Sequence, residues 1–315
     1  MQISKYYNIS KNTFNAIIRE PIFFVILLTS IFILSILPGV ALYSFNEHLK
    51  LIIDSAMATT LLFGLIIAVL VSNKSISEEL ENGIVLLMLS KPISKYAFII
   101  AKIAGVISAL FVFVFLCNCT TIISIYIGEH EFRMDMYLLY GFLIFLAGNL
   151  LYAGIRNYYF HSSVAATFTK SISILLPIFT LCVYLLYRPV ESIDLNNLVR
   201  ALVLLFFSIS IMGVISSIIA IKFNIVVNLI ISSLIFFAGL LSNYFFGRFI
   251  DESLFSATIY SLLPNWQFFW MADAISAQKI IPAIYIFNSF LYTVIYSAFI
   301  TLWATVLFQN KEVAK

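Results

Sequence analysis

Charged residues are scarce in this 315-residue chain. Only 10% of its residues are Asp, Glu, Lys or Arg and 62% are hydrophobic, whereas ordinary soluble domains have about 25% charged and about 45–50% apolar residues. The mean hydropathy is +1.05. The sequence therefore predicts an integral membrane protein. The net charge of +3 is small, and no Lys/Arg cluster is dense enough to indicate a nucleic-acid partner.

Histidine and cysteine are also rare, with three of each in the chain. His130 and Glu131 begin like the HExxH motif of zinc proteases, but Met134 occupies the position of the second histidine. The sequence contains neither a GxSxG serine motif nor a GxxxxGK[ST] phosphate loop. We therefore expect no enzyme activity, catalytic residue, metal or cofactor in this chain. Its histidines are interpreted as loop or interfacial residues, and its cysteines as small buried hydrophobes: His48, His130, His161, Cys117, Cys119 and Cys182.

Long stretches between the charged residues predict about eight membrane-spanning helices. The uncharged windows are 22–46, 55–73, 103–128, 136–155, 171–187, 201–221, 223–247 and 280–310. A helical crossing needs about 17–25 residues. The window 171–187 is the shortest, and its helix can extend back to Val164. We expect one all-α transmembrane domain over residues 1–315, in which residues 1–21 form a helix in the membrane interface ahead of an uncleaved first span.

A ninth uncharged window, 253–272, is not expected to cross the membrane. Pro264 breaks its middle, and Trp266 and Trp270 belong to the residue type that gathers at membrane interfaces. Backbone groups released by such a break cannot face lipid without a partner. We expect residues 248–279 to form an outer cap that contains a re-entrant or interfacial segment.

The distribution of basic residues predicts the orientation of the chain. With the N-terminus inside and eight spans, twelve of the 18 Lys and Arg residues lie in inner segments. Cytoplasmic segments of membrane proteins carry an excess of Lys and Arg. We therefore expect both termini in the cytoplasm and a multi-pass protein of the cell membrane, of prokaryotic origin.

The longest charge-bearing segment, between Lys74 and Lys102, separates the second and third spans. Ser75 followed by Glu78 has the spacing of a capping box, and Gly83 is a natural helix end. The pattern predicts a short, separate helix, which is too short to be stable alone in water and must dock on another surface. A second helix is expected to restart at Ser94. With the predicted orientation, residues 74–97 form a cytoplasmic elbow.

Polar side chains within the predicted spans are few and uncharged. An ion-coupled carrier generally places ionisable residues at membrane depth, and only Asp54 and Lys102 come near a span. The amide and hydroxyl residues either line a pathway or join helices by hydrogen bonds; the main candidates are Asn118, Thr121, Asn149, Asn228 and Asn288. Ala101, Gly105 and Ala109 form a stripe of small residues that predicts close helix packing, within the chain or between subunits.

The elbow resembles the membrane subunit of ABC-2 type ABC transporters. Between their second and third spans these proteins carry roughly E-x-E-x-G-T, then apolar residues, P-x-S-R and a later Lys. The matching residues here are Glu79, Glu81, Gly83, Pro92, Ser94, Lys95 and Lys102. Two positions depart from the pattern, because Ile84 replaces Thr and Lys95 replaces Arg. Weaker similarities lie in residues 11–21 and 263–274. The family commonly has six spans, so 136–155 and 171–187 would form an extra pair.

The resemblance implies a permease subunit of an ATP-binding cassette exporter. The elbow would be a coupling helix that docks on a cytoplasmic ATPase subunit, present in two copies, which binds ATP and Mg. Glu78, Glu79 and Glu81 would contact that subunit, and Gly83 would permit the turn. A second membrane subunit, identical or different, would complete the transporter. The alternatives are an ion-coupled secondary transporter or channel, and a non-transporting assembly or sensor protein. The sequence does not identify a substrate.

Overall fold

The computed structural model describes residues 2–42, 44, 47–81, 95–130, 132–187, 190, 193–250 and 252–309. Within these ranges the regular structure is helical, apart from an isolated bridge between His130 and Arg133. The elements are α1 (Gln2–Arg19), α2 (Pro21–Ala41), α3 (His48–Glu81), α5 (Lys95–Ile127), α6 (Met136–Phe160), α7 (Val164–Leu186), α8 (Leu195–Lys222), α9 (Ile225–Phe245), η1 (Gly247–Phe249), α10 (Leu254–Leu262), η2 (Trp266–Phe269), α11 (Ala272–Ser276) and α12 (Ala283–Gln309).

Eight of the described helices are long and apolar enough to cross a membrane: α2, α3, α5, α6, α7, α8, α9 and α12. They coincide with the eight uncharged windows. The short window 171–187 is extended at its start, as expected, because Ser163 caps a helix that begins at Val164 and ends at Leu186. The chain is an all-α, multi-pass membrane protein.

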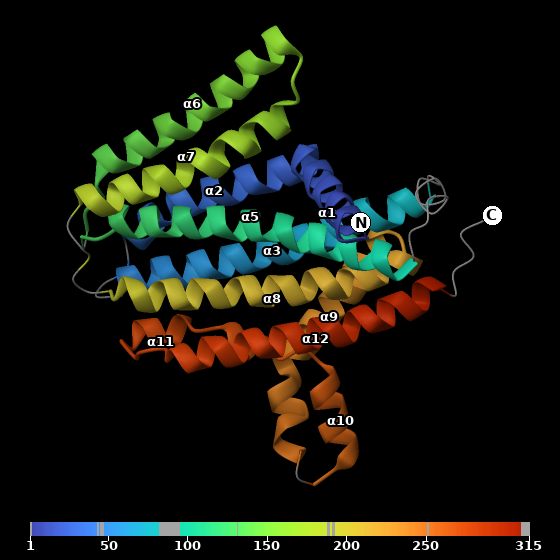
Figure 1. Ribbon diagram of the computed structural model, residues 1–315. Coiled ribbons are helices and arrows are strands. Elements are labelled where there is room, and N and C mark those ends of the chain that lie inside the picture. The colour runs from blue at the N-terminus through green and yellow to red at the C-terminus, as the bar shows by residue number, and fades with distance from the viewer. Residues whose placement is uncertain are drawn as a thin grey trace.

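The spans form a bundle in which α8 lies between α3 and α12 (Figure 1). In the most apolar part of α8, 78% of the residues are buried inside the protein, against 11% in α12. The hairpin of α6 and α7 flanks the bundle on one side, and α9 and α10 project from the other. We call the end where α1 and the last turn of α12 lie the terminal end, and the opposite end the far end. Both described ends of the chain therefore lie on one side of the bundle.

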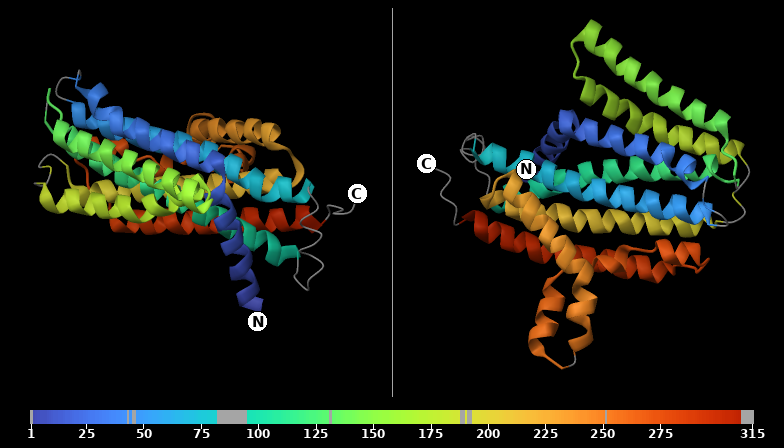
Figure 2. Two further views of the ribbon diagram at one scale, coloured as in Figure 1. Left: turned by 90° about the horizontal axis from the view of Figure 1, so that it is seen from above. Right: turned by 180° about the vertical axis from the view of Figure 1, so that it is seen from behind.

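Helix α1 lies across the terminal end of the bundle rather than along it (Figure 2). Its buried residues Thr13, Ile17 and Ile18 share one face, whereas Asn12 and Ala16 on the opposite face are exposed. Glu20 is extended and Pro21 opens α2, where a missing backbone N–H costs nothing. The buried face packs on the bundle, and the membrane-interface position of residues 1–21 stays a prediction.

Helices α3 and α5 are longer than a membrane requires. They have 34 and 33 residues, so each extends for about 50 Å at about 1.5 Å per residue, against a hydrocarbon layer of about 30 Å. At the terminal end they continue beyond the level of α1 (Figure 1). The ends of α3 and α5 therefore project past the hydrocarbon on that side.

The segment before the last span contains only short helices, as the break at Pro264 predicted. Asn243 of α9 accepts hydrogen bonds from the Tyr260 hydroxyl at 2.7 Å and from the Asn265 amide at 3.0 Å. A Cβ atom on Gly239 would collide with the Pro264 carbonyl oxygen, so only glycine permits this contact. Polar groups of the broken segment thus find partners inside the protein. Helix α10 packs beside α9, and α11 lies at the far end.

Candidate functional site

The predicted separate helix of the elbow does not exist. Helix α3 continues without interruption from His48 to Glu81, so Ser75 lies inside it and its hydroxyl donates to the Ser72 carbonyl oxygen at 3.4 Å. The capping interpretation of Ser75 was wrong. No glycine or proline separates the apolar span from the charged turns, and Lys74 and Glu78 form an i,i+4 ion pair at 2.7 Å that favours helix. The elbow begins as a rigid continuation of a span.

A buried ion pair joins the projecting ends of α3 and α5. The Lys102 ammonium lies 2.5 Å from Glu79 Oε1. The Lys102 side chain is 2% exposed and that of Glu79 is 20% exposed. The lysine lies 5.7 Å from the centre of the Phe98 ring. Burial makes this pair sensitive, because removing one partner leaves a charge without compensation in an apolar setting.

Apolar residues from four helices surround the region of this pair. The cluster combines residues of α3, α5, α8 and α12. Its buried members are Ile76, Phe98, Ile99, Ile103, Val214, Ala220, Ile221 and Ala304. Because this cluster is separate from the main core, it forms a local packing unit at the terminal end. The ion pair is therefore held between helices rather than on a flexible surface.

Hydrogen bonds attach the end of α3 to α8. The Ser72 hydroxyl bonds to the Gly213 carbonyl oxygen at 3.2 Å and to the Ser217 hydroxyl at 3.1 Å. One and a half turns later, the Ser77 hydroxyl donates to the Phe223 carbonyl oxygen at 3.4 Å. These contacts link the second span to the sixth at two levels.

An ion pair links the same turns of α3 to the start of α2. The Lys74 ammonium lies 3.9 Å from a carboxylate oxygen of Glu20, besides its contact with Glu78. We call the whole contact set at the terminal end the joint; it comprises Glu20, Ser72, Lys74, Ser77, Glu79, Lys102, Gly213, Ser217 and Phe223. The sequence analysis did not identify Glu20, Ser72, Lys74 or Ser77 as members of the joint. The only local signal was the i,i+4 spacing of Lys74 and Glu78, which indicates an ion pair within one helix.

The predicted coupling residues fall into three groups. Glu79 and Lys102 meet inside the joint, and Glu78 is exposed beside Lys74. Glu81 is the last residue of α3 and Lys95 the first of α5. Gly83 and Pro92 lie outside the described residues. The expectation that Ser94 restarts a helix also falls outside them, one residue before α5 begins.

Of the five polar span residues singled out from the sequence, two join helices by hydrogen bonds and two bond within their own helix. Asn228 of α9 is fully buried and its amide donates to Ser216 of α8 at 3.0 Å. Asn118 donates to the Leu202 carbonyl oxygen of α8 at 3.2 Å. Thr121 and Asn149 bond to carbonyl oxygens of their own helices. Asn288 differs from the rest, because it is exposed on α12. These five residues are distributed over four helices, α5, α6, α9 and α12.

The stripe of small residues on α5 packs within the chain. Ala101 and Ala109 are buried. A Cβ atom on Gly105 would lie 2.7 Å from Thr13 Cβ and 2.8 Å from the Ser10 carbonyl oxygen, both of α1. The sequence left open whether this stripe packs within the chain or between subunits. In the structure, the chain's own helix α1 covers Gly105.

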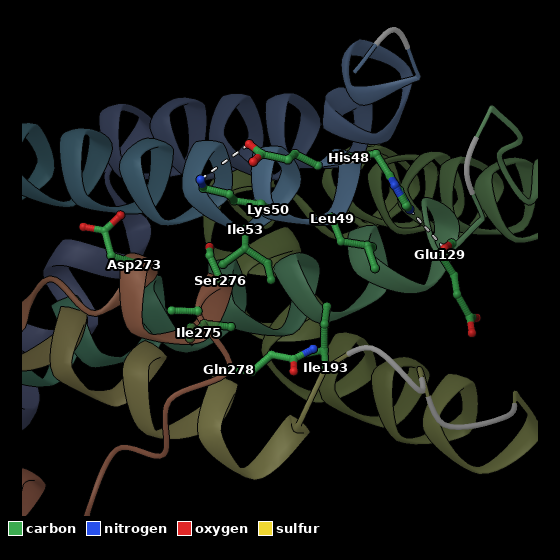
Figure 3. A pocket seen from close by; sticks show the side chains of 12 residues that line it. His48, Leu49, Lys50, Ile53, Glu129, Ile193, Asp273, Ile275, Ser276 and Gln278 are labelled. Carbon is green, nitrogen blue, oxygen red and sulfur yellow. Dashed lines mark hydrogen bonds and ion pairs between the residues drawn. The ribbon is translucent and has the colours of Figure 1, made fainter. Parts of the chain in front are cut away.

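A cavity of about 550 Å³ opens at the far end (Figure 3). It is lined by the first residues of α3, by Glu129 after α5, by Ile193 before α8, and by residues in and after α11. Lys50 pairs with Glu47 at 3.4 Å, and His48 Nε2 lies 3.1 Å from the Glu129 carbonyl oxygen. With the carboxylates of Glu129 and Asp273 the lining carries more acid than base. Among the described residues, no group of three or more His, Cys, Asp or Glu side chains is placed to hold a metal ion.

The histidines and cysteines have the simple roles expected of most of them. His130 lies in the turn between α5 and α6, and His161 ends α6 in a left-handed conformation. Cys117 and Cys119 are buried, and no disulfide joins the three cysteines. Cys182 is exposed on α7, so the buried interpretation was wrong for this residue. A membrane-spanning helix has a lipid-facing side, and a thiol is apolar enough to lie there.

No protein-family model and no curated protein matches this chain.

Proposed function

We propose that this chain is the membrane subunit of an ATP-binding cassette exporter. In this proposal, the joint transmits movement between the membrane-spanning helices and a cytoplasmic ATPase subunit that contacts the segment between Glu81 and Lys95. The observation that carries it is the buried Glu79–Lys102 pair at the projecting ends of α3 and α5. Both flanks of the segment are thereby held as one unit, so a displacement of the segment moves two spans together.

Further contacts extend this unit to other helices. Ser72 and Ser77 connect α3 to α8, and Lys74 connects it to the start of α2 through Glu20. Packed helices respond to a local push by shifting as bodies, since a close-packed interior does not deform continuously. An outside energy source is also needed in this scheme, because the sequence has no phosphate loop of its own. The order Glu79, Glu81, Gly83, Pro92, Ser94 and Lys95 resembles the ABC-2 pattern and supports the same assignment.

The proposal assigns the two ends of the bundle to the two sides of the membrane. The terminal end faces the cytoplasm, so both termini are cytoplasmic and the protein lies in the cell membrane. The acidic far-end cavity then faces outward, where an exported substrate leaves. A complete transporter contains two membrane subunits and two ATPase subunits. An ion-coupled carrier is less well supported, since the Asp, Glu, Lys and Arg residues of the eight described spans lie near helix ends.

The test is isolation of the tagged chain from its native membrane in mild detergent, with mass analysis of the attached proteins and assay of ATP hydrolysis. We expect a co-purifying subunit that contains a phosphate loop. The Glu79→Gln variant should keep this subunit bound but lose the effect of the membrane subunit on its ATP hydrolysis. The matched control is Glu252→Gln, because Glu252 is exposed, lies far from the elbow in the sequence and forms no ion pair with any described residue.

Two results would count against the proposal. One is solute movement in vesicles that contain the purified chain and no ATPase, which would indicate a secondary transporter or a channel. The other is normal coupling in the Glu79→Gln complex with all subunits present. Binding of a partner without any change in ATP hydrolysis would instead indicate an assembly or sensor protein.

A further inference from the structure

A second cavity, of about 490 Å³, lies at the terminal end between the hairpin of α6 and α7 and the end of α1. Its lining contains the three basic residues Arg19, Arg156 and Lys170, and no acidic residue. Four hydroxyl residues also line it: Ser162, Ser163, Thr167 and Ser171. We call this set the basic cavity. It is separate from the joint and plays no part in the proposed coupling.

Within the part of the chain that the structure describes, the three cations of the basic cavity form no ion pair. The ion pairs of the described residues involve Lys50, Lys74 and Lys102, and none involves the three cations of the cavity. Arg156 lies over the ring of Phe160, with 4.8 Å from its guanidinium carbon to the ring centre, which leaves its N–H groups available. Three like charges that converge on one cavity repel each other, so an anion that binds there is stabilised by all three.

The depth of the cavity corresponds to the lipid headgroups. Each cation lies close to the cavity end of an uncharged window: Arg19 lies three residues before 22–46, with Glu20 between, Arg156 follows 136–155, and Lys170 precedes 171–187. All three therefore mark the edge of the hydrocarbon at the same end of the bundle. Tyr158, Tyr159 and Phe160 are exposed at the end of α6, as aromatic residues often are at a membrane interface.

The position of the hairpin leaves the cavity accessible from the lipid. Helices α6 and α7 form the outermost layer on their side of the bundle (Figure 1). Tyr152, Ala166 and Ile174 complete the lining, and Leu151 and Ile155 on α6 are exposed beside it. A ligand with a phosphate group and acyl chains can thus place the phosphate among the cations and the chains along α6.

We propose that the basic cavity binds the phosphate headgroup of an anionic phospholipid. Arginine suits this role because its planar group donates two parallel hydrogen bonds to phosphate oxygens, and basic pockets between membrane helices are suited to acidic lipid headgroups. The bound headgroup bridges Arg19 at the end of α1 to Arg156 and Lys170 on the hairpin. It holds the peripheral α6–α7 hairpin against the rest of the bundle.

The test is a titration of the detergent-solubilised full chain, followed by native mass spectrometry. Three probes are compared: short-chain phosphatidylglycerol, short-chain phosphatidylcholine and inorganic phosphate. We expect phosphatidylglycerol to bind most tightly. Its affinity should fall about fivefold for each of Arg19→Gln, Arg156→Gln and Lys170→Gln, and about a hundredfold for the triple variant. Arg156→Lys should retain more affinity than Arg156→Gln.

The matched control is Arg133→Gln, because Arg133 is an exposed arginine in the far-end turn between α5 and α6. It should leave phosphatidylglycerol binding unchanged. Unchanged binding in the triple variant would overturn the proposal. Displacement of the lipid by an equal concentration of inorganic phosphate would overturn the assignment to a lipid, since it would show a site for a free anion. Melting curves of the single variants, each of which changes one exposed side chain, verify that the protein remains folded.

Discussion

At the residue scale, Lys102 illustrates how a membrane protein can hold a charge. Its ammonium is almost fully enclosed by protein and lies against Glu79 and the ring of Phe98. Withdrawal of two charges from water is costly, and their attraction offsets this cost only while both are present. The pair is therefore more important for holding α3 and α5 in one arrangement than for net stability.

We predict that Lys102→Met and Glu79→Gln each destabilise the protein by about 3–5 kcal/mol, because each leaves one buried group without its partner. The double variant should recover most of this loss, since no charge is then buried. Unfolding in detergent by heat or denaturant measures the effect. Lys74→Met is the control: Lys74 forms a more exposed pair with Glu78, so it should cost no more than about 1 kcal/mol. Equal costs in the single and double variants would contradict the prediction.

At the element scale, the contact between α1 and α5 depends on one glycine. The backbone of α1 at Ser10 and the side chain of Thr13 occupy the space where a side chain on Gly105 would begin. Small residues at such crossings let helices approach closely, which is a main source of packing energy inside a membrane. Helix α1 is thereby fixed next to α2 and near the joint, although its own sequence looks like that of a surface helix.

We predict that Gly105→Ala loosens α1 and destabilises the protein by about 1–3 kcal/mol through overpacking. Limited proteolysis between α1 and α2, at Arg19, should become faster, and the melting temperature should fall. Gly148→Ala on α6 is a matched control, because a Cβ atom there meets nothing within 4 Å. Alanine forms helix better than glycine, so this variant should be neutral or slightly more stable. Similar behaviour of the two variants would show that the crossing tolerates a methyl group.

At the scale of the whole molecule, the two ends of the bundle differ in charge and in how far their helices extend. Helices α3 and α5 project at the terminal end, where Lys11, Lys74 and Lys222 also lie. The far end has the acidic cavity. Since cytoplasmic segments are enriched in Lys and Arg, the charge distribution and the projecting helices favour the same side for the cytoplasm.

This orientation predicts the outcome of cysteine labelling in intact cells. In a chain whose three native cysteines are replaced, a thiol at Arg133→Cys should react with a membrane-impermeant reagent from outside. Thiols at Lys11→Cys and Glu78→Cys should react only after the membrane is permeabilised. All three positions are exposed in the protein, so accessibility depends on the side of the membrane alone. The reverse pattern would invert the proposed orientation and remove the basis for a cytoplasmic ATPase contact.

Much of the fold could be predicted from local properties of the chain. Eight uncharged windows, the proline-broken segment around Pro264 and the start of the short span at Val164 all correspond to described elements. The candidate site was predicted only as a region. Its residues Glu79 and Lys102 were both singled out, but as separate contacts to a partner, and nothing in a sequence separation of 23 residues indicates that they meet.

The sequence by itself determined that the chain is a helical membrane protein and where its helices enter and leave the apolar layer. The reason is that the cost of burying charge and unpaired backbone in hydrocarbon acts on each segment separately. Only the tertiary structure decided that the elbow begins inside a continuous helix and that α1 packs against Gly105. It also decided that Arg19, Arg156 and Lys170 line one cavity. These features depend on which helix faces lie side by side, and packing between distant segments selects those faces.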